Sequence, residues 1–391
     1  MCDMKNKTFS LLYVLLLVSI VTACRTDEVI IPAEYDYLPI GADAHCDPIG
    51  MYVLNEGNMG SNKASIDYVD FENGLYARNL YAERNPTVIK ELGDVGNDLQ
   101  LYGSKLYAVL NSSHKIEVMD ARSLVRIGQI DIPNCRYINF HDGYAYISSY
   151  VGPIAIDPNA QLGAVYRVDT ASLAITGKCM VGYQPEELEF MDNRIYVANS
   201  GGYRKPHYDN TVSVVDIASM RQIEKIAVAP NLHRVRKDAY GKLWVTSRGD
   251  EASIPSRLFV LQRQETASQE VVVTDTLDIP CSDMCICGDS LYFYSTAWSD
   301  RLESNVITYG IVDVRSKQLV TSHFITDGTE VEIEKPYGVA VNPSNGDIYV
   351  TDGKNYVSSG TVHCYNSKGK RKWSMRAGDI PAHMVFLNRD K

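Results

Sequence analysis

Apolar and polar residues alternate along most of this chain, and one phrase of that pattern recurs seven times. In each copy, apolar residues surround an aromatic anchor and run into a polar turn. The copies are "GMYVLNEG" at 50, "KLYAVLNS" at 105, "YAYISSY" at 144, "RIYVANS" at 194, "KLWVTSR" at 242, "SLYFYST" at 290 and "DIYVTDG" at 347. Consecutive anchors lie 39 to 57 residues apart. Period-2 alternation bounded by turn-forming residues predicts half-buried antiparallel strands.

Each repeat contains further strands on either side of this phrase. An apolar alternating segment such as "PEELEFMDN" precedes it, and two segments such as "TVSVVDIAS" and "QIEKIAVA" follow it. Four strands in each of seven repeats predict an all-β fold, a seven-bladed β-propeller. The C-terminal "AHMVFLNRD" reads as one more inner strand, and the chain begins with the phrase that should follow it. We therefore expect the C-terminal strand to close the ring, within a single domain spanning 46–391.

The N-terminus reads as a targeting segment. Lys5 and Lys7 precede an apolar run that is too short to span a membrane, and "VTAC" ends at Cys24. "VTAC" resembles the lipobox of bacterial lipoproteins, which implies a signal peptide over 1–23 and lipidation of Cys24. An ordinary signal peptide is the alternative. The acidic stretch within 24–45 reads as a lipidated tether and resembles a surface-export signal, so we expect a lipid anchor on the outer membrane at the cell surface.

Charge and motifs narrow the classes of function. The formal net charge of −10 argues against a nucleic-acid partner, because such proteins carry a basic patch. Cys285 and Cys287 lie two apart on an expected strand with no His nearby, so core packing is favoured over a metal site. No nucleophile or zinc-protease motif is present. We expect no enzyme activity and no cofactor. A lactonase-like propeller would need a bound metal ion, and Asn97, Glu187 and Asp283 are the residues that could hold it.

One face of the expected propeller carries the candidate binding site. Loops entering the innermost strands and loops joining second to third strands meet there, and several are long and aromatic, including "SGGYRKPHYDN" at 200–210. Aromatic rings and polar tips together suit a broad ligand. From expected loop position, apolar contacts are assigned to Tyr150, Tyr203, Tyr208, Trp298 and Tyr356. Hydrogen-bonding contacts are assigned to Asn55, Arg136, Asn199, Arg248 and Tyr337.

Two longer segments carry a family resemblance. "PYGVAVNPSNGDIYVTDG" is similar to YncE-like and NHL-like propellers, and "MYVLNEGNMGSNKASIDYVDF" resembles the BtuG-type surface lipoproteins. That resemblance implies non-covalent capture of vitamin B12 (cobalamin or another corrinoid) and its transfer to a TonB-dependent outer-membrane transporter. The alternatives are a propeller that binds glycans or a protein partner, a scaffold without a small ligand, and a metal-dependent lactonase-like enzyme.

Overall fold

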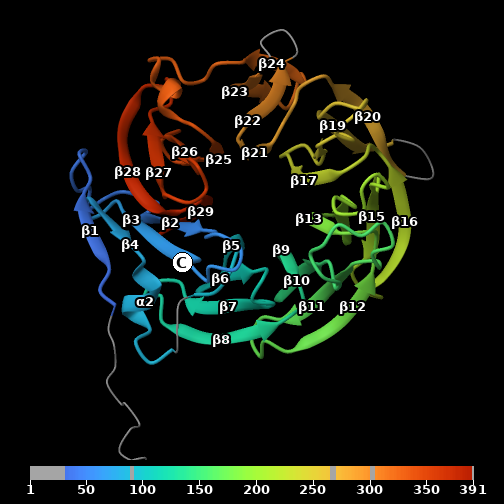
Figure 1. Ribbon diagram of the computed structural model, residues 1–391, viewed down its shortest axis with the longest axis horizontal. Coiled ribbons are helices and arrows are strands. Elements are labelled where there is room, and N and C mark those ends of the chain that lie inside the picture. Colours follow the sequence, from blue (N-terminus) through green and yellow to red (C-terminus); the bar gives the residue numbers. More distant parts are fainter. Residues whose placement is uncertain (1–30, 89–91, 265–269, 300–303, 390–391) are drawn as a thin grey trace, which may run out of the picture.

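The computed structural model describes residues 31–88, 92–264, 270–299 and 304–389. The segment 1–23, where a signal peptide is expected, and Cys24 lie outside these residues. Seven antiparallel sheets stand around a central axis, and the innermost strand of each lines that axis (Figure 1). The predicted all-β, seven-bladed β-propeller is confirmed.

The first sheet contains β1 (Glu34–Tyr37), β2 (Gly50–Asn55), β3 (Ser65–Asp70), β4 (Leu75–Arg78) and the C-terminal β29 (Pro381–Leu387). The next three sheets are β5 (Gly96–Tyr102), β6 (Lys105–Leu110), β7 (Lys115–Asp120) and β8 (Arg126–Asp131); β9 (Cys135–His141), β10 (Tyr144–Ser149), β11 (Ala164–Asp169) and β12 (Ile175–Met180); and β13 (Pro185–Met191), β14 (Arg194–Asn199), β15 (Thr211–Asp216) and β16 (Arg221–Ala227).

The last three sheets are β17 (Leu232–Lys237), β18 (Leu243–Ser247), β19 (Arg257–Arg263) and β20 (Val271–Leu277); β21 (Asp283–Cys287), β22 (Ser290–Ser299), β23 (Ser304–Asp313) and β24 (Gln318–Thr321); and β25 (Pro336–Val341), β26 (Ile348–Asp352), β27 (Ser359–Tyr365) and β28 (Arg371–Asp379). Helix α2 (Leu80–Arg84) follows β4, and a single 3-10 turn, η1 (Thr329–Glu332), precedes β25. Among the described residues, no helix is long and apolar enough to cross a membrane.

The ring closes through β29, as predicted from the C-terminal pattern. β29 pairs antiparallel with β2, placing Phe386 opposite Met51 and Met384 opposite Val53. The two ends of the folded chain therefore share one sheet, and its inner edge is covered by a strand rather than left open.

Buried aromatic residues from the recurrent phrase pack between neighbouring blades. Trp244 is fully buried, and its indole N–H donates to Asp238 Oδ2 at 3.0 Å. Tyr52 is also buried, and its hydroxyl donates to the carbonyl of Ala121 in the neighbouring blade at 2.8 Å. The recurrent aromatic position thus fills the space between sheets and joins them.

Two features differ from the sequence-based expectation. β1 lies inside the range 24–45, where only a tether was expected; it pairs with β4, with Tyr35 opposite Ala77. The expected loop after Ser295 is instead a continuation of the β22–β23 hairpin, in which Trp298 pairs with Asn305.

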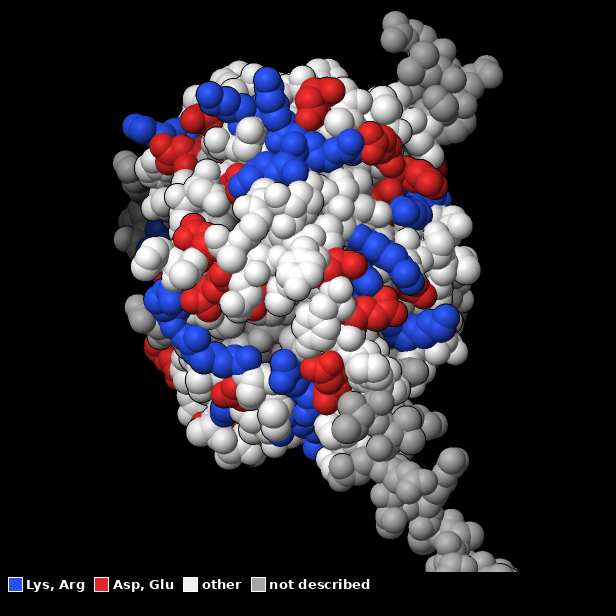
Figure 2. All heavy atoms as spheres, turned by 90° about the vertical axis from the view of Figure 1, so that its left-hand side faces the viewer, with Lys and Arg blue, Asp and Glu red and all other residues white. Residues whose placement is uncertain are grey.

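On the side of the ring that carries β1, basic and acidic side chains are interspersed (Figure 2).

Candidate functional site

A cavity of about 720 Å³ opens at the face where the chain enters the innermost strands. Its wall draws on blades all around the ring. Polar and aromatic side chains in the wall include Glu56, Arg136, Tyr203, His233, Arg248 and Tyr337. The predicted binding face is therefore hollow and polar at its centre.

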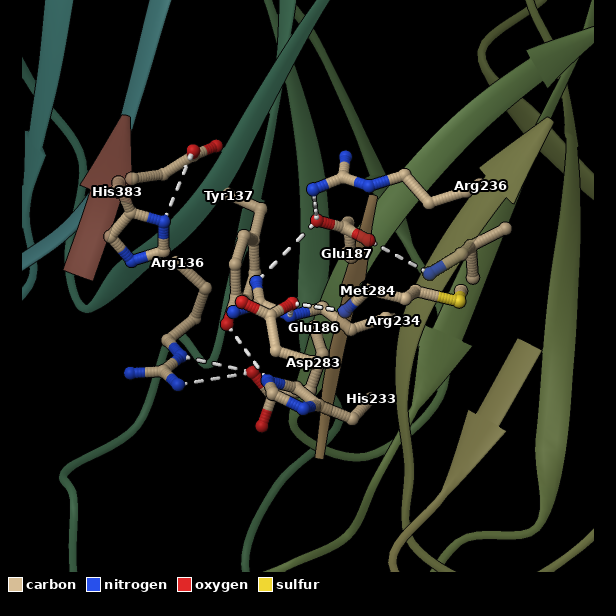
Figure 3. Close-up of polar contacts among 12 residues, drawn as sticks. Arg136, Tyr137, Glu186, Glu187, His233, Arg234, Arg236, Asp283, Met284 and His383 are labelled. Carbon is tan, nitrogen blue, oxygen red and sulfur yellow. Dashed lines mark hydrogen bonds and ion pairs between the residues drawn. The ribbon is translucent and has the colours of Figure 1, made fainter. Parts of the chain in front are cut away.

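A buried carboxylate organises one side of this cavity. Glu186, on β13, is only 1% exposed. Its Oε2 accepts hydrogen bonds from Nε and Nη2 of Arg136 at 3.2 and 3.0 Å (Figure 3). Its Oε1 accepts one from the Tyr150 hydroxyl at 2.6 Å. Burial alone would raise the pKa of Glu186, but the charges of Arg136 and Arg248 and these hydrogen bonds outweigh it and hold the pKa below its usual range.

The next residue on β13 holds a second network, deeper along the axis. Glu187 lies 2.9 Å from Arg236 Nη2 and accepts the Val235 backbone N–H at 2.9 Å. Arg234 bridges Glu187 at 3.5 Å and Asp283 at 2.7 Å. Burial raises the pKa of Glu187, and the nearby Asp283 adds to the rise while the two arginines oppose it.

This second network lies between two cavities. Below it, a space of about 280 Å³ is lined by inner strands, and Arg234 and His383 line both this space and the large cavity. His383 lies 3.7 Å from Glu56 and 3.9 Å from Asp98. The axis is thus crossed by paired side chains rather than left as an open pore.

A buried histidine, His233, faces the large cavity. The Tyr137 hydroxyl and His233 Nε2 lie 2.9 Å apart, within hydrogen-bonding distance. Burial lowers the pKa of His233 well below its usual range, and the charges of Arg248, Arg234 and Arg136 lower it further. Its Nδ1 is buried without a partner among the described residues.

Asn97, Glu187 and Asp283, the candidates for a lactonase-type metal site, form hydrogen bonds and ion pairs with other protein groups. The two oxygens of Glu187 face Arg236 and a backbone N–H, and Asp283 pairs with Arg234. The Asn97 amide donates to the carbonyl of Arg136 at 2.6 Å. In the part of the chain that the structure describes, no group of three or more His, Cys, Asp or Glu side chains is arranged to hold a metal. These residues do not fit a metal centre.

Half of the predicted binding residues line the large cavity: Arg136, Tyr203, Arg248, Tyr337 and Tyr356. Tyr150 is buried at 3% exposure and lines a neighbouring cavity of about 330 Å³. Two aromatic pairs result. Tyr337 and Tyr356 have ring centroids 5.7 Å apart, and Tyr150 and Tyr203 have centroids 6.2 Å apart.

The other predicted residues lie elsewhere. Asn55 and Asn199 are fully buried at strand ends, where they hydrogen-bond inside their own blades: Asn55 to Ser65, and Asn199 to Thr211. They hold the rim loops in place rather than face the cavity. Tyr208 is half-buried and does not line the cavities named above. The backbone of Trp298 belongs to β22, and its side chain lies outside the described part.

Sequence reasoning missed Glu56 and Tyr137 as cavity residues. The innermost strands of six blades carry a register shift at their entry, for example between Leu232 and Val235. Such a bulge sets two consecutive side chains toward the same space, as with Arg136 and Tyr137. Strict alternation would have placed one residue of this pair in the blade, so the pattern gave no signal for Tyr137. Glu56 lies in the β2–β3 loop, where there is no alternation to follow.

A family model for a domain of unknown function, DUF5074, matches residues 49–387. The chain belongs to this family. A search of the curated proteins found no match. DUF5074 thus covers the whole ring, from the start of β2 to the end of β29.

Solved structures show the same fold at low identity. The hypothetical selenium-binding protein from Sulfolobus tokodaii has a TM-score of 0.64 at 11% identity, covering 87% of this chain and 94% of that one. A quinonprotein alcohol dehydrogenase-like protein from Bacteroides thetaiotaomicron has a TM-score of 0.55 at 13% identity, covering 88% and 79%. Hydrazine synthase from Kuenenia stuttgartiensis has a TM-score of 0.56 at 16% identity, covering 70% and 76%. These likenesses place the DUF5074 chain among propellers and support the fold alone.

Exposed apolar side chains mark the rim around the large cavity of this DUF5074 chain. Met59, Ile156, Ile254 and Val357 are 62%, 70%, 40% and 71% exposed. Each lies in a loop joining the second and third strands of a different blade. The rim is therefore apolar at its tips and polar inside.

Proposed function

We propose that this protein captures a corrinoid, vitamin B12 or a relative, non-covalently in the central cavity. The observation that carries the proposal is the cavity of about 720 Å³, lined by tyrosine, arginine and histidine side chains from several blades. A corrinoid is broad and studded with amides, so it needs a wide face that offers ring contact together with hydrogen-bond donors and acceptors. The family resemblance of the N-terminal phrase points to the same ligand class.

The cavity wall supports tight binding because it is held before a ligand arrives. The Tyr337 hydroxyl donates to Glu56 Oε2 at 2.9 Å, and Arg136 is fixed by its two hydrogen bonds to Glu186. Side chains that are already ordered lose little conformational entropy on binding. In this proposal the protein needs no cofactor and performs no covalent step.

The remaining parts of the proposal concern place and partner. The lipobox-like "VTAC" supports a lipid anchor at Cys24 and a position on the outer-membrane surface. From there the protein passes its ligand to a TonB-dependent transporter. Globomycin treatment, which blocks lipoprotein signal cleavage, should cause the uncleaved precursor to accumulate; unchanged processing would refute the anchor.

Calorimetric titration of the purified protein with cyanocobalamin tests the ligand. Tyr356→Ala removes a ring that is 38% exposed at the cavity, and we expect it to weaken binding by roughly tenfold. Tyr240→Ala is the matched control, because Tyr240 is 48% exposed in the β17–β18 turn and does not line the cavity. No heat and no thermal stabilisation with the wild-type protein would refute the corrinoid assignment.

A second candidate function is docking of a glycan or a protein partner on the rim. The apolar tips at Met59, Ile156, Ile254 and Val357 favour it, since exposed apolar groups gathered on one face mark interaction surfaces. Oligosaccharide arrays and co-purification with candidate surface proteins would identify such a partner. Binding that survives a large excess of cyanocobalamin would separate this function from ligand capture.

A further inference from the structure

The large cavity and the neighbouring cavity of about 330 Å³ share a wall. Arg136, Tyr203 and Arg248 line both spaces. Arg136 lies on β9, Arg248 directly follows β18, and Tyr203 lies in the loop between β14 and β15. Three adjacent blades therefore bring two guanidinium groups to one boundary.

These two guanidinium groups share a single carboxylate. Arg136 occupies Oε2 of Glu186, while Tyr150 and Ser200 donate to Oε1 at 2.6 and 3.3 Å. Arg248 Nη1 reaches the same Oε1 only at 3.6 Å. The carboxylate is therefore filled by the other donors, and Arg248 is only loosely held.

The charge at this boundary is unbalanced. The smaller cavity is lined by three cationic side chains, Arg136, Lys205 and Arg248, against two carboxylates, Glu186 and Glu251. Lys205 and Glu251 pair with each other at 2.5 Å. One positive charge is left over, and it belongs to the arginine pair.

Each guanidinium group of this pair has N–H donors that Glu186 does not use, and Arg248 is the more exposed of the two. Arg248 has a 41% exposed side chain, and among the described residues Glu186 is its only ionic partner. Arg136 uses Nε and Nη2 for Glu186, which leaves Nη1 without a described partner. The positive charge of these arginines also acts on the nearby His233, whose pKa is lowered by burial and by Arg248, Arg234 and Arg136.

We propose that this shared wall is a subsite for one anionic oxygen group of the bound ligand, a phosphate ester or a carboxylate, held by Arg248 and Arg136. The inference rests on the proposed function and adds to it the charge that the ligand must carry. A guanidinium presents paired N–H donors that match the oxygens of phosphate and carboxylate. Tyr203 covers the group from the side of the β14–β15 loop.

Paired corrinoids test the subsite by calorimetry on the full-length protein. Cobalamin carries a phosphodiester, and cobinamide has the same ring without it. We expect Arg248→Gln to weaken cobalamin binding about tenfold, which corresponds to loss of one charge-assisted contact, and to change cobinamide binding less than about twofold. Arg257→Gln is the matched control, because Arg257 has a similar 39% exposed side chain in the same blade and pairs with Asp278 away from the cavity. An equal effect of Arg248→Gln on both corrinoids, or no effect on either, would overturn the subsite.

A second measurement separates failure of the subsite from failure of the proposed function. If wild-type protein binds neither corrinoid, the corrinoid proposal fails while the subsite is still tested with inorganic phosphate and acetate against chloride at equal ionic strength. We expect one of these anions to raise the thermal midpoint of the wild type and of Arg257→Gln, but not of Arg248→Gln. Phosphate acting alone would assign a phosphate group, and acetate acting alone a carboxylate. No shift in the wild type with either anion refutes the subsite.

Discussion

Replacing Glu186 with glutamine should remove the charge that orders one side of the central cavity. Glutamine keeps the size of the side chain, so no void forms. It offers one acceptor oxygen and one amide in place of two acceptor oxygens. Either Arg136 or the Tyr150 hydroxyl must then face an N–H group, because these donors approach opposite oxygens of Glu186.

The size of the effect follows from burial. Glu186 is 1% exposed, and the side chain of its partner Arg136 is 15% exposed, so the guanidinium left behind is poorly solvated. Breaking a buried ion pair by removing one partner costs about 3–5 kcal/mol of unfolding free energy. The exposed pair on the same rim offers a control: Glu251→Gln should cost at most about 1 kcal/mol, because surface ion pairs contribute little.

Urea unfolding followed by tryptophan fluorescence measures these costs, since Trp244 and Trp373 are buried in different blades. The pH dependence has a definite sign. A carboxylate whose pKa is lowered in the folded state stabilises the fold above its unfolded pKa, about 4.3, and that stabilisation is lost as pH falls through the folded pKa. The wild type should therefore have a larger free energy of unfolding than Glu186→Gln at pH 7, and the two free energies should converge in acid. A difference under about 1 kcal/mol at pH 7, or one unchanged at pH 3, would refute the reasoning.

Three further outcomes are expected. Residues 201–208 can be replaced with a short turn that keeps Asp209, because the Asp209 carboxylate accepts the Tyr183 N–H at 2.8 Å. This change should leave the circular dichroism spectrum as it is and weaken cyanocobalamin binding. Full affinity would contradict a role for this loop. Ending the chain before β29 exposes the inner edge of β2, so size-exclusion chromatography should show aggregates, whereas removal of 388–391 should leave a monomer. Cys135 is fully buried, which raises the pKa of its thiol to about 12, so mass spectrometry should find no iodoacetamide adduct until urea is added.

Much of the fold was predictable because a propeller repeats its pattern. The inner-strand column of Leu99, Ile138, Leu188 and Val235 is buried in the structure, as alternation requires. β1 was not predictable, because it is only four residues long and all four are exposed, so its alternation of acidic and tyrosine residues marks no buried face. Its pairing depends on tertiary contacts with β4.

The candidate site was only partly predictable. Position at a strand entry identified Arg136, but the same kind of reasoning assigned Asn55 and Asn199 to a ligand, whereas each serves hydrogen bonds within its blade. A polar residue at a strand end has the same pattern whether it binds a ligand or a loop. Only the geometry of the bulged entries and the depth of burial separate the two uses.

Strand β1, at the outer edge of the first sheet, determines how the molecule would respond to mechanical force. A pull on the N-terminus would reach β1 first, which is held to β4, to Arg78 through Glu34 and to Glu83 through the Tyr35 hydroxyl. That strand can peel away one pair at a time while β2 and β29 stay joined at the inner edge. A force on the N-terminus would therefore separate β1 from the outer edge of the first sheet before it reaches the strands that line the central cavity.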